Sequence, residues 1–280
     1  MTKENRVILG VLKGVAASDG DGVKLRRYIG GPELDYLDPF LMLDVFGTDE
    51  PQDYIGGFPS HPHRGFETVT YLLAGKMRHK DNAGNEGVII PGGVQWMTAG
   101  RGIIHSEMPE QTEGLLKGFQ LWVNLPAEHK MTEPGYQEFP PENIPVFDLP
   151  DNNGTVRLIA GKLDSGESGP VTNPHTNPNF MDITLSAEGL FTQSMDEDDH
   201  GFVFCIDGDI TVAGEQVRPG DLAVLGYGEQ LQIKGEREGG RCLFVSGQRL
   251  REQVVKGGPF VMSTREEVLQ AFEDYRSGQF

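Results

Sequence analysis

Residues 58–74 read FPSHPHRGFETVTYLLA, and this stretch decides the fold prediction. His61 and His63 are separated by one residue, and a run rich in β-branched and aromatic residues follows over residues 67–74. Successive side chains of an extended strand point to opposite faces, so residues two apart share a face. The stretch therefore predicts strands, one of which presents two imidazoles on the same side.

The rest of the chain continues this pattern. Short β-branched or aromatic runs alternate with turn dipeptides such as Asp19-Gly20, Gly92-Gly93, Asn153-Gly154 and Asp207-Gly208, which is typical of all-β proteins. Their even spacing favours closed barrels or sandwiches. The expected strands cover residues 6–12, 41–46, 67–74, 87–90, 119–125, 156–160, 180–186, 201–206, 209–212, 221–225, 230–234 and 241–246.

A chain of 280 residues suits two domains of ordinary size. Residues 140–145 read PPENIP, which can continue neither a helix nor a central strand, so we place the boundary there. This predicts an N-terminal domain over residues 1–139, which contains the histidine pair, and a C-terminal domain over residues 140–280. The second ends in the one clear helix, where Thr264 and Glu267 form a capping-box pattern.

Composition limits the classes of function. The formal charge of −18 and the lack of a Lys/Arg cluster argue against direct binding of nucleic acid. Cys205 and Cys242 both lie in apolar strand-like runs, which predicts inert buried thiols and no disulfide framework. No apolar run reaches membrane length, so we expect a cytoplasmic protein that does not bind membranes.

A second pair with the same spacing, His105 and Glu107, follows the first along the chain. Two such strands facing each other would direct three imidazoles and one carboxylate to one point. Imidazole and carboxylate ligands suit iron, manganese, nickel, copper and zinc alike. The predicted ligands of one divalent metal ion are His61, His63, His105 and Glu107.

Glu67 is the alternative carboxylate, because it would share a face with His61 and His63 if one regular strand ran through Gly65. We favour Glu107 and expect Glu67 to be the hydrogen-bond partner of a ligand histidine. The charged neighbours of His79 and His129 predict solvated loop residues.

These residues resemble the pirin family, a branch of the cupin superfamily, over nearly the whole chain. The motifs that carry the resemblance are LDPFLMLD (residues 37–44), FPSHPHRGFETVTYLLA (58–74), GGVQWMTAGRGIIHSEMP (92–109), LWVNLP (121–126) and GPFVM (258–262) before the capped helix. The resemblance implies two stacked cupin β-barrels. It also implies iron(II) in the N-terminal barrel, held by His61, His63, His105 and Glu107, and a C-terminal barrel that lacks a metal.

The resemblance further implies quercetin 2,3-dioxygenase activity, in which a flavonol reacts with dioxygen and Glu107 takes the proton of the flavonol hydroxyl as the catalytic base. Phe46, Phe58, Trp96 and Met97 are candidate walls for a flat substrate, and equally candidates for barrel core. Two alternatives remain open. One is an iron-binding regulatory protein that contacts a transcription factor or metabolic enzyme in a redox-dependent way, and the other is a catalytically silent zinc or nickel barrel. We expect a monomer, because barrels of this size can each fill a core.

Overall fold

The computed structural model describes residues 3–280, whose contacts divide them into two compact units. The 15–141 unit comprises Val15–Pro141 together with Leu250–Phe280, and the 142–249 unit comprises Glu142–Arg249 together with residues 3–14. The division between Pro141 and Glu142 lies close to the predicted boundary. The units differ from the predicted contiguous domains at the two ends of the chain, because each terminal segment packs with the unit formed by the distant half of the sequence.

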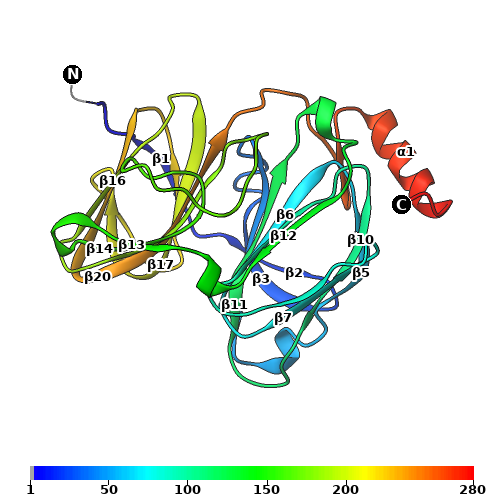
Figure 1. Cartoon of the computed structure of the whole chain (residues 1–280), viewed down its shortest axis with the longest axis horizontal. Coiled ribbons are helices and arrows are strands. Elements are labelled where there is room, and N and C mark those ends of the chain that lie inside the picture. The colour runs from blue at the N-terminus through cyan, green and yellow to red at the C-terminus, as the bar shows by residue number, and fades with distance from the viewer. Residues whose placement is uncertain (1–2) are drawn as a thin grey trace. The chain divides into compact units, whose positions relative to one another are not determined.

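The 15–141 unit contains a seven-stranded and a four-stranded antiparallel sheet, coloured blue through green in Figure 1. The seven-stranded sheet has the order β12-β9-β6-β11-β4-β3-β2, and the four-stranded sheet has the order β5-β10-β7-β8. Their apolar side chains meet in buried clusters that include Phe46, Leu72 and Ile89. The strands are β2 (Val15–Asp19), β3 (Val23–Ile29), β4 (Phe40–Thr48), β5 (Phe58–His63), β6 (Phe66–Ala74), β7 (Met77–Asp81), β8 (Glu86–Ile89), β9 (Val94–Thr98), β10 (Ile103–Pro109), β11 (Leu116–Asn124) and β12 (Gly135–Phe139), with 3-10 helices η1 (Pro51–Asp53) and η2 (Ala127–His129). The 3-10 helix η3 (Pro141–Asn143) begins at the last residue of this segment and continues into the 142–249 unit.

The 142–249 unit is built on one nine-stranded sheet around a large apolar core. Cys205 and Cys242 lie opposite each other in this core, and both are buried free thiols, as predicted. Burial raises the pKa of Cys205 to about 12 and that of Cys242 well above its usual value, so neither is a thiolate at neutral pH. The strands are β1 (Ile8–Leu12), β13 (Val146–Asp148), β14 (Gly154–Ala160), β15 (Asn179–Leu185), β16 (Leu190–Ser194), β17 (Asp199–Val212), β18 (Glu215–Val217), β19 (Leu222–Leu225) and β20 (Gln230–Gln248), with the 3-10 helix η4 (Pro150–Asn152).

Two pairs of separately predicted strands are continuous in the structure. Residues 201–206 and 209–212 belong to β17, and residues 230–234 and 241–246 belong to β20. The turn predicted at Asp207-Gly208 is wrong, because pairing between β17 and β20 continues past it with register shifts on both sides. Such bulges bend a strand without ending it.

The C-terminal segment of the 15–141 unit consists of β21 (Val255–Gly257), β22 (Phe260–Met262) and α1 (Arg265–Arg276), shown in orange and red in Figure 1. The predicted capping box is confirmed: Thr264 Oγ1 accepts from Glu267 N, and the Glu267 carboxylate accepts from Thr264 N. Phe272 of α1 packs edge-on against Phe260 of β22, with ring centroids 4.9 Å apart. Within residues 3–280, no helix has the length and apolar character needed to cross a membrane.

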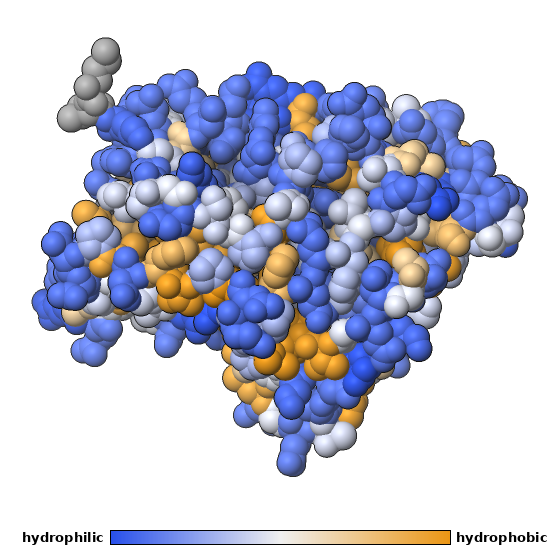
Figure 2. Space-filling view, in the orientation of Figure 1, coloured by the Kyte–Doolittle hydropathy of each residue, from blue (hydrophilic) through white to orange (hydrophobic). Residues whose placement is uncertain are grey.

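The fold class is therefore all-β with one C-terminal helix, as predicted. The sheets of each unit form an open jelly roll and not a fully closed barrel, which refines the prediction. Hydrophilic residues cover most of the face seen in Figure 2, with hydrophobic residues in small patches. Many of the acidic residues, such as Glu33, Glu113 and Glu197, are exposed.

Candidate metal centre

Three of the predicted ligands meet at one point. His61 and His63 lie on β5 and His105 lies on β10, and a ligand atom from each falls within 4.8 Å of the other two. The two strands are neighbours in one sheet, with His105 opposite His61, so they do not face each other across the unit as we expected. β5 is an edge strand of this sheet, a position in which Pro62 is tolerated.

The Nε2 atoms of the three histidines form the centre of the cluster. His61 Nε2 lies 3.0 Å from His63 Nε2 and 3.0 Å from His105 Nε2. His61 Nδ1 bonds the Pro59 carbonyl at 2.8 Å, and His63 Nδ1 bonds the Pro259 carbonyl at 3.4 Å. Because a carbonyl oxygen only accepts, these two Nδ1 atoms carry the proton and both Nε2 atoms present a lone pair.

Burial keeps the imidazoles of His63 and His105 uncharged. Desolvation, followed by the neighbouring His61, lowers the pKa of His63 to about 3. Desolvation, followed by the other histidines, lowers the pKa of His105 well below its usual value. Both side chains are therefore neutral at pH 7, which is the state in which imidazole binds a metal ion.

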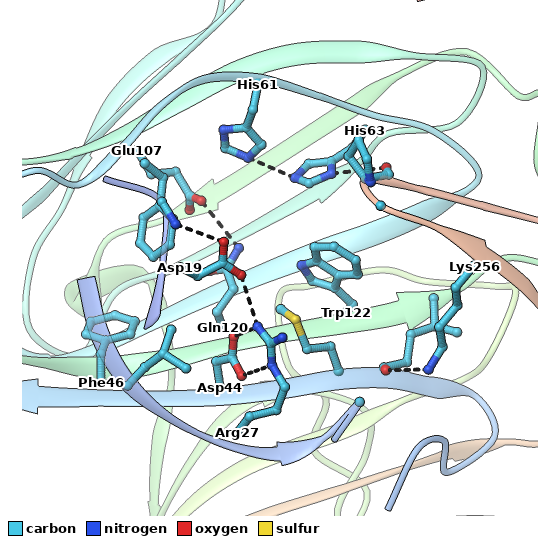
Figure 3. Close-up of a pocket in the computed structure, with 18 of the residues that line it drawn as sticks. Asp19, Arg27, Asp44, Phe46, His61, His63, Glu107, Gln120, Trp122 and Lys256 are labelled. Atoms are coloured by element: carbon cyan, nitrogen blue, oxygen red, sulfur yellow. Dashed lines mark hydrogen bonds and ion pairs between the residues drawn. The ribbon is translucent and has the colours of Figure 1, made fainter. Parts of the chain in front are cut away.

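Glu107 points from β10 into the space between the two sheets (Figure 3). Thr70 Oγ1 lies 2.7 Å from both Glu107 Oε1 and Gln120 Oε1, and Gln120 Nε2 donates to Glu107 Oε2 at 3.4 Å. Its carboxylate is outside the cluster of mutually close ligand atoms found among the described residues. Glu107 thus lies two residues after His105 on β10, and its carboxylate is hydrogen-bonded to Thr70 and Gln120.

Glu67 lies elsewhere. The strand carrying the first two histidines ends at His63, and β6 begins at Phe66 after Gly65, which has φ +88°. A Cβ at Gly65 would lie 2.0 Å from Val261 O, so this close turn requires glycine. The regular strand on which the Glu67 alternative depended is therefore absent, and Glu67 Oε1 accepts from Thr98 Oγ1 at 2.7 Å.

His79 is the functional candidate that the sequence interpretation missed. We predicted a solvated loop residue, but His79 lies on β7 and is fully buried. Its Nδ1 lies 3.5 Å from His105 Nδ1, and its Nε2 lies 3.1 Å from Asp81 Oδ2. The sequence did contain a signal for this site, because His79 and Asp81 are separated by one residue, as are His61 and His63 and also His105 and Glu107. His129, by contrast, is partly exposed on η2.

A cavity of about 630 Å³ adjoins His61, His63 and Glu107. Phe46 and Phe58 line it, as expected, but Trp96 and Met97 are core residues with at most 1% exposure. Trp122 supplies an aromatic wall that sequence reasoning missed, and its ring meets His63 edge-on with centroids 5.1 Å apart. This size and mixed lining are typical of small-molecule sites.

The far side of the cavity is polar. Arg27 forms a bidentate pair with Asp44, with nitrogen–oxygen distances of 2.8 and 2.6 Å, and also bonds Asp19 at 3.0 Å (Figure 3). Burial raises the pKa of Asp44, while the guanidinium acts in the opposite direction; the bidentate geometry indicates an ion pair. Lys256, Gly258 and Pro259 line the cavity from the C-terminal segment.

The donor set fits a first-row divalent metal. The Nε2 atoms of three imidazoles lie together, two of the rings, His63 and His105, are buried and neutral, and a carboxylate lies on the next inward position of β10. A jelly roll that carries clustered histidines beside a cavity is typical of cupin proteins.

Comparisons with known proteins indicate the same class of protein. The pirin family model matches residues 22–123, and the model of the pirin C-terminal cupin domain matches residues 180–280. A pirin-like protein of Caulobacter vibrioides is 48% identical over 275 residues, covering 98% of this chain and 99% of that protein. The chain therefore belongs to the pirin family.

Solved structures extend the likeness. A structure described as quercetin 2,3-dioxygenase from Acinetobacter baumannii has a TM-score of 0.89 and 32% identity, over 99% of this chain and 98% of that one. A bacterial pirin from Escherichia coli in complex with nickel(II) has a TM-score of 0.66, over 84% of this chain and 95% of that one. At 18% identity, the second likeness concerns the fold alone.

Proposed function

We propose that this protein is a metal-dependent dioxygenase that cleaves flavonols such as quercetin with dioxygen. The observation that carries the proposal is the cluster of three histidine Nε2 atoms next to a cavity that His61, His63, Glu107 and aromatic walls line. The likeness to the Acinetobacter quercetin dioxygenase structure over nearly the full chain supports it.

In this proposal His61, His63, His105 and Glu107 hold one divalent metal ion, with iron(II) as the first choice. When bound, such an ion supplies a Lewis acid that acidifies a phenolic hydroxyl, and four protein ligands leave coordination positions free. The Nδ1 contacts described above hold the rings so that their lone pairs point to the same place.

Glu107 is the proposed catalytic base for the flavonol hydroxyl. Its hydrogen-bond partners suit that role, because the single hydroxyl proton of Thr70 lies between two acceptors. With a proton on Glu107, the carboxyl can donate to Thr70 Oγ1 and the Thr70 hydroxyl can donate to Gln120 Oε1. Glu107 Oε1, Thr70 Oγ1 and Gln120 Oε1 then each take part in a hydrogen bond.

The cavity walls orient the substrate. Phe46, Phe58 and Trp122 offer apolar surface to flat aromatic rings, and Arg27 and Asp44 offer fixed charges to the substrate hydroxyls at the polar side. Ring contacts of this kind hold a planar substrate in one orientation at little cost in conformational entropy.

The test is anaerobic reconstitution of metal-free protein with Fe²⁺, Mn²⁺, Ni²⁺, Cu²⁺ and Zn²⁺ in separate samples. Each sample is then mixed with quercetin in air, and quercetin loss and carbon monoxide release are measured. We expect turnover with at least one redox-active or nickel sample and none with zinc. His61→Ala should abolish turnover and metal retention, whereas His129→Ala, at a partly exposed histidine, should change neither.

Stoichiometric metal binding without quercetin turnover in any sample would contradict the proposed function. Full activity and metal content in both His61→Ala and Glu107→Ala would contradict the ligand set.

A further inference from the structure

His105 differs from the other two histidines in what its Nδ1 contacts. His61 and His63 each bond a backbone carbonyl, which fixes the position of the ring proton. His105 Nδ1 instead lies 3.5 Å from another ring nitrogen, Nδ1 of His79, and either atom could be the donor. If His105 carried its proton on Nε2, that nitrogen would lack the lone pair needed to bind a metal.

Asp81 settles which atom donates. Its Oδ1 accepts from the backbone N–H groups of Ala83 at 3.0 Å and Asn85 at 2.9 Å. Its Oδ2 accepts from Asn85 Nδ2 at 2.9 Å and lies 3.1 Å from His79 Nε2. An ionised carboxylate only accepts, so Nε2 of His79 carries the ring proton.

The position of this proton determines the next contact. A neutral His79 that is protonated on Nε2 has a bare Nδ1, which can only accept. His105 Nδ1 must then be the donor, and the lone pair of His105 is left on Nε2, at the centre of the cluster. Asp81, His79 and His105 are all buried, so water does not compete for the hydrogen bonds between them.

We infer that His79 and Asp81 are positioning residues of the metal centre, which hold His105 in the one tautomer that can bind a metal ion. The inference rests on the metal site proposed above. Neither residue contacts the cluster centre or the substrate cavity directly, so their effect is transmitted through the ring of His105.

Asp81→Asn tests the direction of the hydrogen bonds. The two backbone N–H groups that bond Oδ1 require the amide oxygen of the variant at that position, which places its NH₂ group against His79 Nε2. His79 must then accept on Nε2 and carry its proton on Nδ1. Two donors would meet between His79 and His105, so His105 should move its proton to Nε2.

The primary readout is the long-range ¹H–¹⁵N imidazole NMR spectrum of metal-free protein labelled at its seven histidines. Wild type should show His105 protonated on Nδ1, and Asp81→Asn should show it protonated on Nε2. The second readout is the Kd for Ni²⁺ alone, measured by competition with a chelator. We expect Asp81→Asn and His79→Leu to raise this Kd about 10–100-fold.

Two variants separate positioning from folding. His79→Asn places an amide oxygen near the Nδ1 position and should restore most of the Ni²⁺ affinity lost in His79→Leu. Asn85→Ala perturbs the same turn but keeps the carboxylate on His79, so its Ni²⁺ Kd and its His105 tautomer should match wild type.

An unchanged His105 tautomer in Asp81→Asn would overturn the inference, and so would an equal loss of Ni²⁺ affinity in Asn85→Ala. If wild-type protein bound no Ni²⁺, the proposed metal function would fail, and the spectrum of the metal-free protein would still decide whether Asp81 and His79 set the tautomer.

Discussion

Glu107 and Glu67 are both buried carboxylates within a few residues of a histidine, but they have different neighbours. Glu107 lines the cavity and bonds Thr70 and Gln120, whereas Glu67 bonds Thr98 on the seven-stranded sheet. Only Glu107 can reach a substrate in the cavity from its present position. A carboxylate that accepts a substrate proton must lie within hydrogen-bond reach of that proton.

The first prediction compares these two residues. Glu107→Gln should lower kcat/KM for quercetin about 100-fold or more, because the amide cannot accept the proton. Glu67→Gln keeps an oxygen for Thr98 and should retain activity within about tenfold. Both values are to be measured on protein of known metal content, and the opposite ranking would show that Glu67 is the catalytic carboxylate.

Asp199 provides a pH-dependent prediction in the 142–249 unit. Desolvation, with Asp196 next, raises the pKa of Asp199 to about 6, above the value of about 3.9 for an unfolded chain. Between these two values the folded state binds more protons than the unfolded state. This carboxyl therefore favours folding below about pH 4 and disfavours it increasingly as the pH rises through 6.

Asp199→Asn should accordingly raise the free energy of unfolding at pH 7.5 by about 1 kcal/mol or more, with little change at pH 4. Denaturant titrations of wild type and variant at pH 4, 5, 6 and 7.5 give the difference directly. Asp49→Asn removes an exposed carboxyl and is the matched control. A difference independent of pH would contradict the raised pKa.

The spacing of residues along a strand explains how much of the site the sequence could predict. Alternation is local, so the pairs His61/His63 and His105/Glu107 could be assigned to common faces from sequence alone. The pair His79/Asp81 obeys the same rule, but Arg78 and Lys80 on the outward face led to a loop prediction. Alternation does not say which face of a strand meets the cavity, so Trp96 could not be assigned to wall or core and Trp122 was missed as a wall.

At the scale of elements, the C-terminal segment is the feature that local patterns could not place. Pro259 contacts His63 across 196 positions of sequence, and Arg64 forms an ion pair with Asp274 of α1 at 2.6 Å. The helix itself was predictable, because capping depends on residues three apart. Its docking site depends on the tertiary fold, since Arg64, directly after the histidines, forms a bridge with Phe260 of β22 and the ion pair with α1.

The third prediction concerns the start of this helix. Thr264→Ala removes the side-chain oxygen that accepts from Glu267 N and should lower the free energy of unfolding by about 1 kcal/mol. Thr264→Ser keeps the oxygen and should restore most of the loss. Amide exchange of α1 and β22 should be faster in the alanine variant, and equal exchange in all three proteins would contradict the role of the cap.

At the scale of the whole molecule, the metal site and the N-terminal segment belong to different units. Arg6 is 2% exposed, and its guanidinium donates to the backbone carbonyls of Gly226 at 2.7 Å and Asp199 at 2.8 Å, and also to that of Asp196. All these partners lie in the 142–249 unit. The ligands of the proposed metal centre and their hydrogen-bond partners all lie in the 15–141 unit.

The fourth prediction follows from this separation. Arg6→Met leaves buried carbonyls without a donor and should destabilise the 142–249 unit by at least about 2 kcal/mol. The Ni²⁺ Kd at 10 °C, where the protein is still folded, should stay close to that of wild type. Calorimetry and Ni²⁺ titration measure the two effects. A parallel loss of Ni²⁺ affinity would show that the units do not behave independently.

The most direct test of the account is anomalous X-ray diffraction from crystals of the nickel-loaded protein, recorded at the nickel absorption edge. We expect one strong anomalous peak in the 15–141 unit, coordinated by Nε2 of His61, His63 and His105 and by a carboxylate oxygen of Glu107. A peak coordinated by Glu67 in place of Glu107, or a peak away from the three histidines, would contradict it.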